Sequence, residues 1–579
     1  MPIYFTVQPG GAYIHTYNES GPKGARIIYP NYKHEAPGTR MSFWHYDPEE
    51  RGWYIYGAGS VDSVGRQAIP DPGVAVYEFT GAMLNAGMSP PAVASQPCNC
   101  ASDGDPVDLG TGLFTYNQTD LVLPDIIPIT LTRTYRPNDA AVRPFGIGAN
   151  HPYGIFLYSA NQYQEADLVL PDGAKIHYVR TTPGTSYTTA VFEATSTPTG
   201  AYKSRIVWNG NGWDLTMKDG SVLVFGENAP LQAIRDRNGN QLTLTRTNGQ
   251  LGNITRVTSP NGRWIEFTYD GSNRVTQARD NIGRTVGYTY DASGRLFHVT
   301  DAAGGVTEYT YDSSHRMLTI KDATNIVYLT NQYDANGRVT LQTQADGTTY
   351  QFAYTLDGSG KITQTTVIDP RGNTRTVTFN SSGYKLTDTR GCCGGLAHTI
   401  ERQAGTSLPL SVTDPLGRRT DYNYDSMGNV TSITRMAGTP EAVSMTLTYE
   451  PVFNQVATVT DPLNHTSTYQ YDVMGNLTTV TDPLNHSTTF GYNAAGQIVS
   501  VIDTLNHTTQ FAYEGADLVS ATDPLGRTVK RFVDAAGRVL TLTNALGEVV
   551  RYEYDSLNRR TKVIDPLQGQ TVFDYNANS

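Results

Sequence analysis

Apolar and polar residues alternate in short stretches along most of the chain, and turn-forming residues interrupt these stretches at regular distances. In residues 284–290 (Arg-Thr-Val-Gly-Tyr-Thr-Tyr) the valine and tyrosines share one face, while threonine and glycine occupy the other. A period of two is typical of a β-strand that has one covered and one open face. The pattern therefore predicts an all-β fold of short antiparallel strands with an aromatic-rich face and a threonine-rich face.

A sequence motif recurs from about Arg235 onward. It consists of an aromatic residue and an acid, two variable residues, Gly or Asn, and then often Arg and an apolar residue; residues 290–296 and 333–339 are clean copies. The spacing is mostly 20 to 22 residues. Related copies begin at Tyr269, Tyr311, Tyr424, Tyr471, Tyr492, Tyr513, Val533 and Tyr554, with degenerate copies near Tyr354, Phe379 and Tyr449. Such a short fixed period indicates a repeat architecture rather than several unrelated domains.

A second motif lies between these copies. It reads Thr-Asp-Pro-Leu-Gly or Thr-Asp-Pro-Leu-Asn, at residues 413–417, 460–464, 481–485 and 522–526. Asp can accept hydrogen bonds from backbone amides two residues on, Pro presets φ, and Gly or Asn tolerates the left-handed conformation of a tight turn. Each unit of about 21 residues therefore predicts two strands and two turns of different type.

About fourteen such units would supply some 28 antiparallel strands, and at ~4.8 Å per strand the ribbon would be roughly 130 Å long. Open sheets of more than about ten strands rarely stay flat, because twist accumulates from strand to strand. We therefore expect a spiral. The two turn types would line opposite edges of the ribbon, so successive coils can meet edge to edge and hide their strand ends.

These motifs resemble the RHS or YD-repeat family. The resemblance extends upstream, where residues 104–112 (Gly-Asp-Pro-Val-Asp-Leu-Gly-Thr-Gly), 121–124 and 132–135 are similar to the segment that opens the repeats of bacterial RHS proteins. It covers roughly residues 97–579. The resemblance implies a hollow cocoon, which encloses a carboxy-terminal toxin in toxin-delivery proteins and forms part of an adhesion receptor in animal teneurins. The predicted fold is thus a long antiparallel YD-repeat hairpin ribbon, wound into a spiral or cocoon-like shell, with a small amino-terminal β domain.

We divide the chain into three parts on this basis. Residues 1–96 lack the repeat but contain aromatic strand-like stretches, and they predict the amino-terminal β domain. Residues 97–234 are the RHS-opening β segment, and residues 235–579 are the YD-repeat spiral sheet. The last residues fall inside a repeat unit, so we expect the sheet to be truncated at its carboxy end.

One departure from the family concerns self-cleavage. Bacterial toxin shells usually close with a core segment that carries an Asp-Pro-x-Gly cleavage motif, preceded by an aromatic Arg-Tyr-Tyr-Asp stretch. Residues 565–569 (Asp-Pro-Leu-Gln-Gly) instead read as an ordinary turn between repeats, and no toxin-like sequence follows. Self-cleavage is not assigned to this chain.

The amino-acid composition excludes some classes of binding partner. Hydrophobic residues make up 38% and charged residues 17% of the 579 residues, and the net charge is −11. A chain without a general positive field is not expected to bind nucleic acid. No apolar run reaches the roughly 20 residues that cross a bilayer, and the first residues are not a signal segment. From the resemblance we expect a bacterial protein that is secreted or at the cell surface.

The four cysteines form two tight pairs, Cys98 with Cys100 and Cys392 with Cys393. Four thiolates could hold a structural zinc ion, although neither spacing is the usual two-residue gap. Disulfides between the pairs are the preferred alternative, and they would close a loop of almost 300 residues. Both arrangements require the two pairs to lie close together. Apart from this possible zinc, no cofactor is predicted.

Two other groups of polar residues have an ordinary structural interpretation. His465, His486 and His507 recur every 21 residues. Equivalent positions two strands apart are roughly 9 to 10 Å from each other, too far to share a metal ion, so they predict a ladder of repeated turn positions. Residues 45–50 (His-Tyr-Asp-Pro-Glu-Glu) combine an imidazole with three carboxylates, but Asp-Pro favours a turn over acid–base chemistry.

The leading function is therefore a structural shell segment that encapsulates or displays a partner or toxin domain that this chain does not contain. A carbohydrate- or protein-binding adhesion module is the alternative, with exposed Tyr and Trp side chains holding a surface glycan or protein. A metal-dependent enzyme using the cysteines is the third. Possible partners are accordingly an encapsulated polypeptide or a surface glycan.

Overall fold

The computed structural model describes residues 3–5, 12–13, 27–31, 34–47, 52–72, 74–75, 78–79, 81–85, 101–137, 139–195, 200–390 and 397–577. This part of the chain is all β and contains no α-helix. Two single 3-10 turns, η1 (Pro152–Gly154) and η2 (Tyr187–Thr189), interrupt the strands. No helix in the described ranges has the length and apolar character needed to cross a membrane. The predicted fold class is confirmed.

A small sheet forms at the amino terminus. Its six strands run in the order β1-β8-β4-β5-β6-β3, and β2 pairs with β7 separately. Tyr29, Met41, Phe43 and Ala68 make a small core of their own between these strands. The strands are β1 (Ile3–Phe5), β2 (Ala12–Tyr13), β3 (Tyr29–Pro30), β4 (Arg40–Asp47), β5 (Gly52–Val61), β6 (Gln67–Pro70), β7 (Glu78–Phe79) and β8 (Gly81–Asn85).

Residues 101–154 follow as a compact segment of short strands, which we name the covering segment. A three-stranded sheet of order β11-β12-β15 is its centre, and two short hairpins flank it. Its strands are β9 (Ser102–Asp103), β10 (Val107–Asp108), β11 (Tyr116–Leu123), β12 (Ile129–Tyr135), β13 (Val142–Arg143), β14 (Gly146–Ile147) and β15 (Ala149–Asn150).

The rest of the chain is one antiparallel sheet of 39 described strands, in which every strand pairs with its sequence neighbours. We call β16 to β37 the first coil and β38 to β54 the second coil. The first coil contains β16 (Phe156–Tyr158), β17 (Glu165–Val169), β18 (Lys175–Arg180), β19 (Val191–Glu193), β20 (Arg205–Trp208), β21 (Gly212–Thr216), β22 (Val222–Gly226), β23 (Leu231–Arg235), β24 (Gln241–Asn248), β25 (Leu251–Thr258), β26 (Trp264–Tyr269), β27 (Val275–Asp280), β28 (Thr285–Tyr290), β29 (Leu296–Thr300), β30 (Val306–Tyr311), β31 (Met317–Lys321), β32 (Val327–Tyr333), β33 (Val339–Gln344), β34 (Thr349–Leu356), β35 (Ile362–Ile368), β36 (Thr374–Phe379) and β37 (Lys385–Arg390).

The second coil continues the same ribbon, because β37 pairs with β38. Its strands are β38 (Ala397–Arg402), β39 (Pro409–Thr413), β40 (Arg419–Tyr424), β41 (Val430–Arg435), β42 (Val443–Tyr449), β43 (Val456–Thr460), β44 (Thr466–Tyr471), β45 (Leu477–Thr481), β46 (Ser487–Tyr492), β47 (Ile498–Ile502), β48 (Thr508–Glu514), β49 (Asp517–Thr522), β50 (Thr528–Val533), β51 (Val539–Thr543), β52 (Val549–Tyr554), β53 (Arg560–Ile564) and β54 (Gln570–Val572).

The sheet has 39 described strands instead of the roughly 28 that the repeat count predicts, because hairpins from residue 156 onward already belong to the same sheet. The sheet also crosses residue 235 without a break, since β23 pairs with β24. The division of the chain into residues 1–96, 97–234 and 235–579 stays a prediction.

Two kinds of turn alternate along the ribbon and lie on opposite edges. From β26 onward, the turns after even-numbered strands carry the Tyr-Asp motif or a variant of it, and we call their side of the ribbon the YD edge. The turns after odd-numbered strands form the opposite side, which we call the DP edge because Asp-Pro opens most of these turns in the second coil. In a YD turn, the Asp291 side chain accepts hydrogen bonds from the amides of Ser293 and Arg295 at 2.9 and 3.0 Å. The Arg295 guanidinium pairs with Asp291 and also donates to the carbonyl of Asp312, in the next YD turn, at 2.7 Å. Arginine thus links consecutive units along the edge.

The tyrosine of the motif also links neighbouring units. The Tyr311 hydroxyl donates to the carbonyl of Leu296 at 2.8 Å, fifteen residues earlier. The register shifts just before this tyrosine, between Thr310 and Tyr311, which marks a β-bulge. Bulges increase the local twist, so a bulge repeated in most units helps to wind the ribbon. The same backward bond is made by Tyr269, Tyr290, Tyr354, Tyr424, Tyr471, Tyr492, Tyr554 and Tyr575.

We expect Tyr311→Phe to lower the free energy of unfolding by about 1 kcal/mol, because the Leu296 carbonyl loses its hydroxyl donor while the ring keeps its packing. Denaturant unfolding of the variant and the parent chain measures this difference. Thr289→Val, at a strand position whose side chain is exposed, is the control and should change stability by less than about 0.5 kcal/mol. Equal stability of Tyr311→Phe and the parent would contradict a structural role for the hydroxyl.

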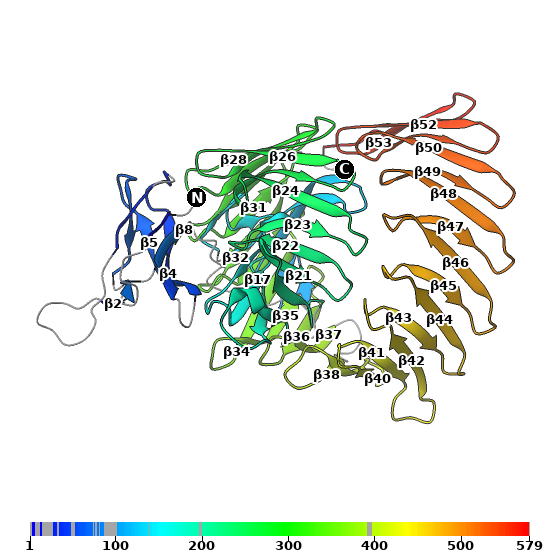
Figure 1. The fold of residues 1–579 in the computed structure, drawn as a ribbon, viewed down its shortest axis with the longest axis horizontal. Coiled ribbons are helices and arrows are strands. Elements are labelled where there is room, and N and C mark those ends of the chain that lie inside the picture. Colours follow the sequence, from blue (N-terminus) through cyan, green and yellow to red (C-terminus); the bar gives the residue numbers. More distant parts are fainter. Residues whose placement is uncertain are drawn as a thin grey trace, which may run out of the picture.

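The ribbon winds into a spiral rather than closing into a barrel (Figure 1). The strands from β16 to β37 make the first turn of the spiral, and β38 to β54 continue as an arc beside it, drawn from yellow to red in Figure 1. The buried core lies in the first coil and the covering segment. Among the described residues from 397 onward, Ala437 and Ala536 are the only buried hydrophobic ones.

Candidate functional site

The second coil docks on the first along a seam between their turns. Side chains on the DP edge of the first coil donate hydrogen bonds to backbone carbonyls on the YD edge of the second. Lys218 donates to Met427 at 3.0 Å, Asn240 donates to Ala495 at 2.9 Å, and Asn281 donates to Ala535 at 2.8 Å. The edge-to-edge contact expected from the two turn types is therefore present.

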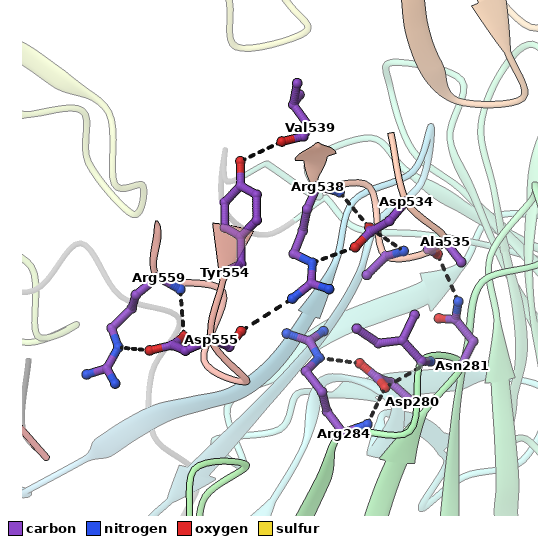
Figure 2. Close-up of polar contacts among 12 residues, drawn as sticks. Asp280, Asn281, Arg284, Asp534, Ala535, Arg538, Val539, Tyr554, Asp555 and Arg559 are labelled. Carbon is purple, nitrogen blue, oxygen red and sulfur yellow. Dashed lines mark hydrogen bonds and ion pairs between the residues drawn. The ribbon is translucent and has the colours of Figure 1, made fainter. Parts of the chain in front are cut away.

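Figure 2 shows one end of this seam, where a DP turn of the first coil meets a YD turn of the second. Asp280 is fully buried and pairs with Arg284 at 2.6 Å inside its own turn. On the other side, Asp534 pairs with Arg538 at 2.7 Å. Each turn is thus rigid by itself, and Asn281 bridges the two.

Arg263 lies at the same end of the seam and joins three acceptors. Its guanidinium donates to the Ala535 carbonyl at 3.0 Å, to the Pro124 carbonyl, and to the Asp517 carboxylate. The side chain is largely buried. One residue of the first coil therefore ties together the covering segment and the second coil.

We expect Arg263→Ala to weaken the seam by about 2 kcal/mol, because hydrogen bonds to a charged group are worth roughly 1.5–3 kcal/mol. Hydrogen–deuterium exchange measures this locally. Amides of β49 to β51 should exchange faster, while those of β30 to β36 keep their protection. Arg527→Ala is the control, since that arginine is exposed and pairs only within its own turn. If the amides of β49 to β51 exchange at the same rate in Arg263→Ala as in the parent chain, the seam does not depend on this residue.

The covering segment lies against the aromatic face of the first coil, and Figure 1 shows it in light blue among the green strands. An ion pair is buried there: Arg133 and Asp120 are both 4% exposed and 2.6 Å apart. Tyr288 of β28 donates to Asp120 at 2.7 Å, and Arg133 donates to Tyr309 of β30 at 3.3 Å. Burial favours the neutral form of Arg133, but Asp120 and Tyr309 outweigh it and hold the pKa of Arg133 well above its usual value.

The covering segment also contacts strands further along the first coil. The backbone of Asp105 makes two hydrogen bonds with the Gln342 side chain: its amide donates to the side-chain oxygen at 2.9 Å, and its carbonyl accepts from the side-chain nitrogen at 3.0 Å. The Thr365 hydroxyl donates to the carbonyl of Leu109. Gln342 and Thr365 are fully buried. These two polar side chains of the otherwise apolar face of the first coil thus fix the position of the covering segment.

His151 ends the covering segment and has an unusual environment. Its Nδ1 accepts a hydrogen bond from the amide of Tyr153 at 3.2 Å, and the ring stacks on Phe267 of β26 with an interplanar angle of 7°. Nε2 is buried and has no hydrogen-bond partner. Burial, and to a smaller extent the positive charge of Arg246, lowers the pKa of His151 to about 3. The imidazole is therefore neutral in the folded chain.

Within the described ranges, no segment covers the aromatic face of the second coil in the same way. Tyr469, Phe490 and Phe511 occupy positions on this face that correspond to Tyr288, and all three remain half-buried. Tyr288 by contrast is 3% exposed. The difference lies in the covering segment, which packs on the aromatic face of the first coil and meets the second coil at the seam, where Pro124 lies beside Gly537.

The sequence-based metal site cannot be placed. Cys98, Cys100, Cys392 and Cys393 lie outside the described residues, as do Pro48 and the two glutamates after it. His45 and Asp47 fall on strand β4. In the ranges that the structure describes, no three His, Cys, Asp or Glu side chains are grouped so as to hold a metal ion. Zinc and disulfides both remain predictions.

The histidine ladder and the last Asp-Pro motif are turn elements, as predicted. Nδ1 of His465, His486 and His507 lies 3.0 Å from the Asp of the same turn in each case. In the last motif, the Asp565 side chain accepts hydrogen bonds from the amides of Leu567 and Gly569 at 2.9 and 2.7 Å. This is the same arrangement as in the other DP turns.

Sequence reasoning missed Asp120, Arg133 and His151. Arg133 had a visible signal, because it stands on the apolar face of an alternating strand, between Leu131 and Tyr135. A charge at such a position needs a buried partner. Nothing in the sequence identified Asp120 as that partner; in the structure it falls at a bulge between Thr119 and Leu121.

Comparisons with known proteins agree with this fold. The RHS repeat family model matches eight successive stretches between residues 248 and 577, and a model described as a domain of unknown function, DUF6531, matches residues 104–178. The chain is an RHS-repeat protein. No curated protein matches it.

Solved structures with likeness to the chain include components of Tc toxins. A Photorhabdus luminescens Tc holotoxin pore with a mutated TccC3 is 13% identical, with a TM-score of 0.45, over 78% of this chain and 24% of that one. A crystal structure of TcdB2–TccC3 is also 13% identical, with a TM-score of 0.46, over 94% of this chain and 30% of that one. This chain therefore spans less than a third of the length of these two.

Proposed function

We propose that the chain is part of the wall of a protein shell and that the second coil faces an enclosed polypeptide. The single observation that carries this proposal is the uncovered aromatic face of the second coil, beside a first coil in which the same face is buried under the covering segment. A sheet with one apolar face normally buries that face against another element. The occupant is then a polypeptide with an irregular, partly apolar surface, as the covering segment is.

Electron cryomicroscopy of the purified chain tests the enclosure. We expect a hollow interior bounded by the arc of the second coil, with the seam visible along one side. A chain carrying Arg263→Ala together with Asn281→Ala should give a more open particle, because both substitutions remove side chains that hold the coils together. A solid or extended rod in place of a hollow particle would contradict the proposal. From the resemblance to bacterial RHS proteins, we also propose that the protein is secreted or displayed on the surface.

A second candidate function, glycan binding, is favoured by a chain of aromatic rings on the first coil. The ring centroids of Tyr163 and Tyr187 are 5.8 Å apart, those of Tyr187 and Trp208 are 4.9 Å apart, and those of Trp208 and Trp213 are 5.3 Å apart. Tyr187, on η2, is 42% exposed. Aromatic side chains with an apolar body and a polar tip suit ligands that have both kinds of surface.

Glycan-array binding measures this second candidate. Trp208→Ala should abolish binding, whereas Trp264→Ala, which removes a tryptophan stacked with Arg256 outside this group, should leave it unchanged. An array without signal for the parent chain would remove this candidate and leave the shell proposal untouched.

A further inference from the structure

A row of exposed leucines lies on the DP edge of the second coil. These leucines occupy the third position of seven of the eight turns on this edge, the turn at residues 436–439 being the exception, and the leucine residues are between 71% and 92% exposed. Single exposed leucines are common on protein surfaces, but a long regular row is not. We name this row the leucine rim. Its members are Leu416, Leu463, Leu484, Leu505, Leu525, Leu546 and Leu567.

The backbone at each leucine of the rim is held in a fixed position. The amide of Leu484 donates to the Asp482 side chain at 2.8 Å, and the amide of Leu505 donates to Asp503 at the same distance. The other five amides make the same bond to the Asp or Asn that opens their turn. An apolar surface that is rigid before binding loses little conformational entropy when it is covered. The rim is therefore suited to association.

The corresponding edge of the first coil is chemically different. There the third turn position at the seam is Asp219, Asn238, Asn261 or Ile282, and Asn238 accepts a hydrogen bond from Asn476 of the second coil at 3.2 Å. Polar side chains also supply the seam's donors to YD-edge carbonyls, as Asn240 does for Ala495. Leucine offers no donor. At the third turn position the rim thus carries leucine where two turns of the seam carry Asn238 and Asn261, and a row of leucines fits an apolar surface.

We infer that the leucine rim binds the leucine rim of a second copy of this chain. Consecutive DP turns are two strands apart, which is ~9.6 Å. Two antiparallel rows offset by half this distance interdigitate, with each leucine filling the gap between two leucines of the partner. A two-fold axis pairs the same edge of the two copies. The two edges then have the same curvature and can stay in contact along their whole length. In Figure 1 the rim is the side of the arc that faces away from the first coil.

The area is sufficient for a stable dimer. A leucine side chain that moves from solvent into an interface removes on the order of 100 Å² of apolar surface, so fourteen leucines remove about 1,400 Å². This value lies within the usual range for specific protein–protein interfaces. The rim is also continuous with an edge that already serves as an interface, because the DP edge of the first coil carries the seam.

Sedimentation velocity of the full chain over a concentration series tests the inference. We expect a dimer of twice the chain mass, which persists at 0.5 M NaCl because apolar contacts are not screened by salt. Leu484→Ser with Leu505→Ser removes two central leucines from each copy and should raise the dimer dissociation constant at least 100-fold. Both leucines are more than two-thirds exposed, so the substitutions leave the fold intact.

The matched control is Val473→Ser, which removes an exposed apolar side chain from the YD edge of the same coil. Its dissociation constant should equal that of the parent. A parent chain that stays monomeric at 50 µM would overturn the inference. So would a dimer that resists the leucine substitutions, or a mass that keeps rising with concentration, since open growth indicates a head-to-tail contact.

Discussion

Asp120→Asn should destabilise the chain by about 3–5 kcal/mol, the usual cost of leaving one partner of a buried ion pair without its counter-charge. Arg133 is 4% exposed and cannot turn toward water. Its charge in the parent chain is balanced by Asp120, which also accepts the Tyr288 hydroxyl. Asparagine would keep one acceptor oxygen but would direct an amide group at the guanidinium. Urea denaturation followed by tryptophan fluorescence measures the loss.

Asp523→Asn is the matched control for this prediction. Asp523 also pairs with an arginine at 2.6 Å, but Arg527 is 66% exposed and water replaces the lost interaction. We expect a change below about 1 kcal/mol. In the double variant Asp120→Leu with Arg133→Met, the buried charge is gone and most of the stability should return. A loss in Asp120→Asn no larger than in Asp523→Asn would show that the pair does not hold the covering segment.

The strands and turns of this protein could be predicted from sequence because their causes are local. A turn such as residues 291–295 is specified within five residues: Asp291 binds the amides of Ser293 and Arg295, and Gly294 takes a φ of 83°. The alternation of the flanking strands sets the two faces in the same local way. Repetition of such a unit then implies a long ribbon, and the twist of a long ribbon implies a spiral.

The contacts between coils depend instead on distances that no local pattern contains. Asn281 and Ala535 meet because the ribbon returns to its own edge after one turn of the spiral, and the pitch of that turn follows from small twists summed over about twenty strands. The number of strands per turn cannot be read from any one repeat. For the same reason, the Asp-Pro-Leu motif predicts a turn but does not reveal whether its leucine is docked, like Asn238 at the seam, or exposed, like Leu484.

The position of the covering segment on the first coil could not be predicted from the sequence either. Its resemblance to an RHS-opening segment placed it before the repeats, but Asp105 contacts Gln342, which is 237 residues away. Polar residues on the aromatic face, such as Gln342 and Thr365, interrupt the apolar pattern. In the structure these interruptions mark where the segment binds.

Acid should destabilise the first coil through His151. The pKa of this imidazole is about 3 in the folded chain, mainly because the ring is buried, and about 6.5 when the chain is unfolded. Below pH 6.5 the unfolded state takes up a proton that the folded state does not, so folding stability falls with decreasing pH until about pH 3. The loss is roughly 1.4 kcal/mol per pH unit, or about 3 kcal/mol by pH 4.5.

His151→Asn isolates this contribution, because the asparagine side chain can still accept the Tyr153 amide but does not titrate in this range. Removal of the ring stacked on Phe267 lowers stability equally at every pH. The stability difference between parent and variant should therefore shrink as the pH is lowered from 7 to 4.5, by about 3 kcal/mol. Chemical denaturation at a series of pH values measures it. His465→Asn is the control, since His465 is 57% exposed and lies outside the covering segment.

A constant difference between the parent and His151→Asn would mean that the folded chain already admits the proton, and that the covering segment opens locally around His151. Hydrogen exchange at pH 4.5 distinguishes local from global opening. If the segment stays docked, amides of β12 and β26 remain protected together up to the global transition. If it opens first, β12 loses protection while β26 keeps its sheet hydrogen bonds to β25 and β27. We expect joint protection, because Tyr135 binds both the carbonyl of His315 and the amide of Met317, independently of His151.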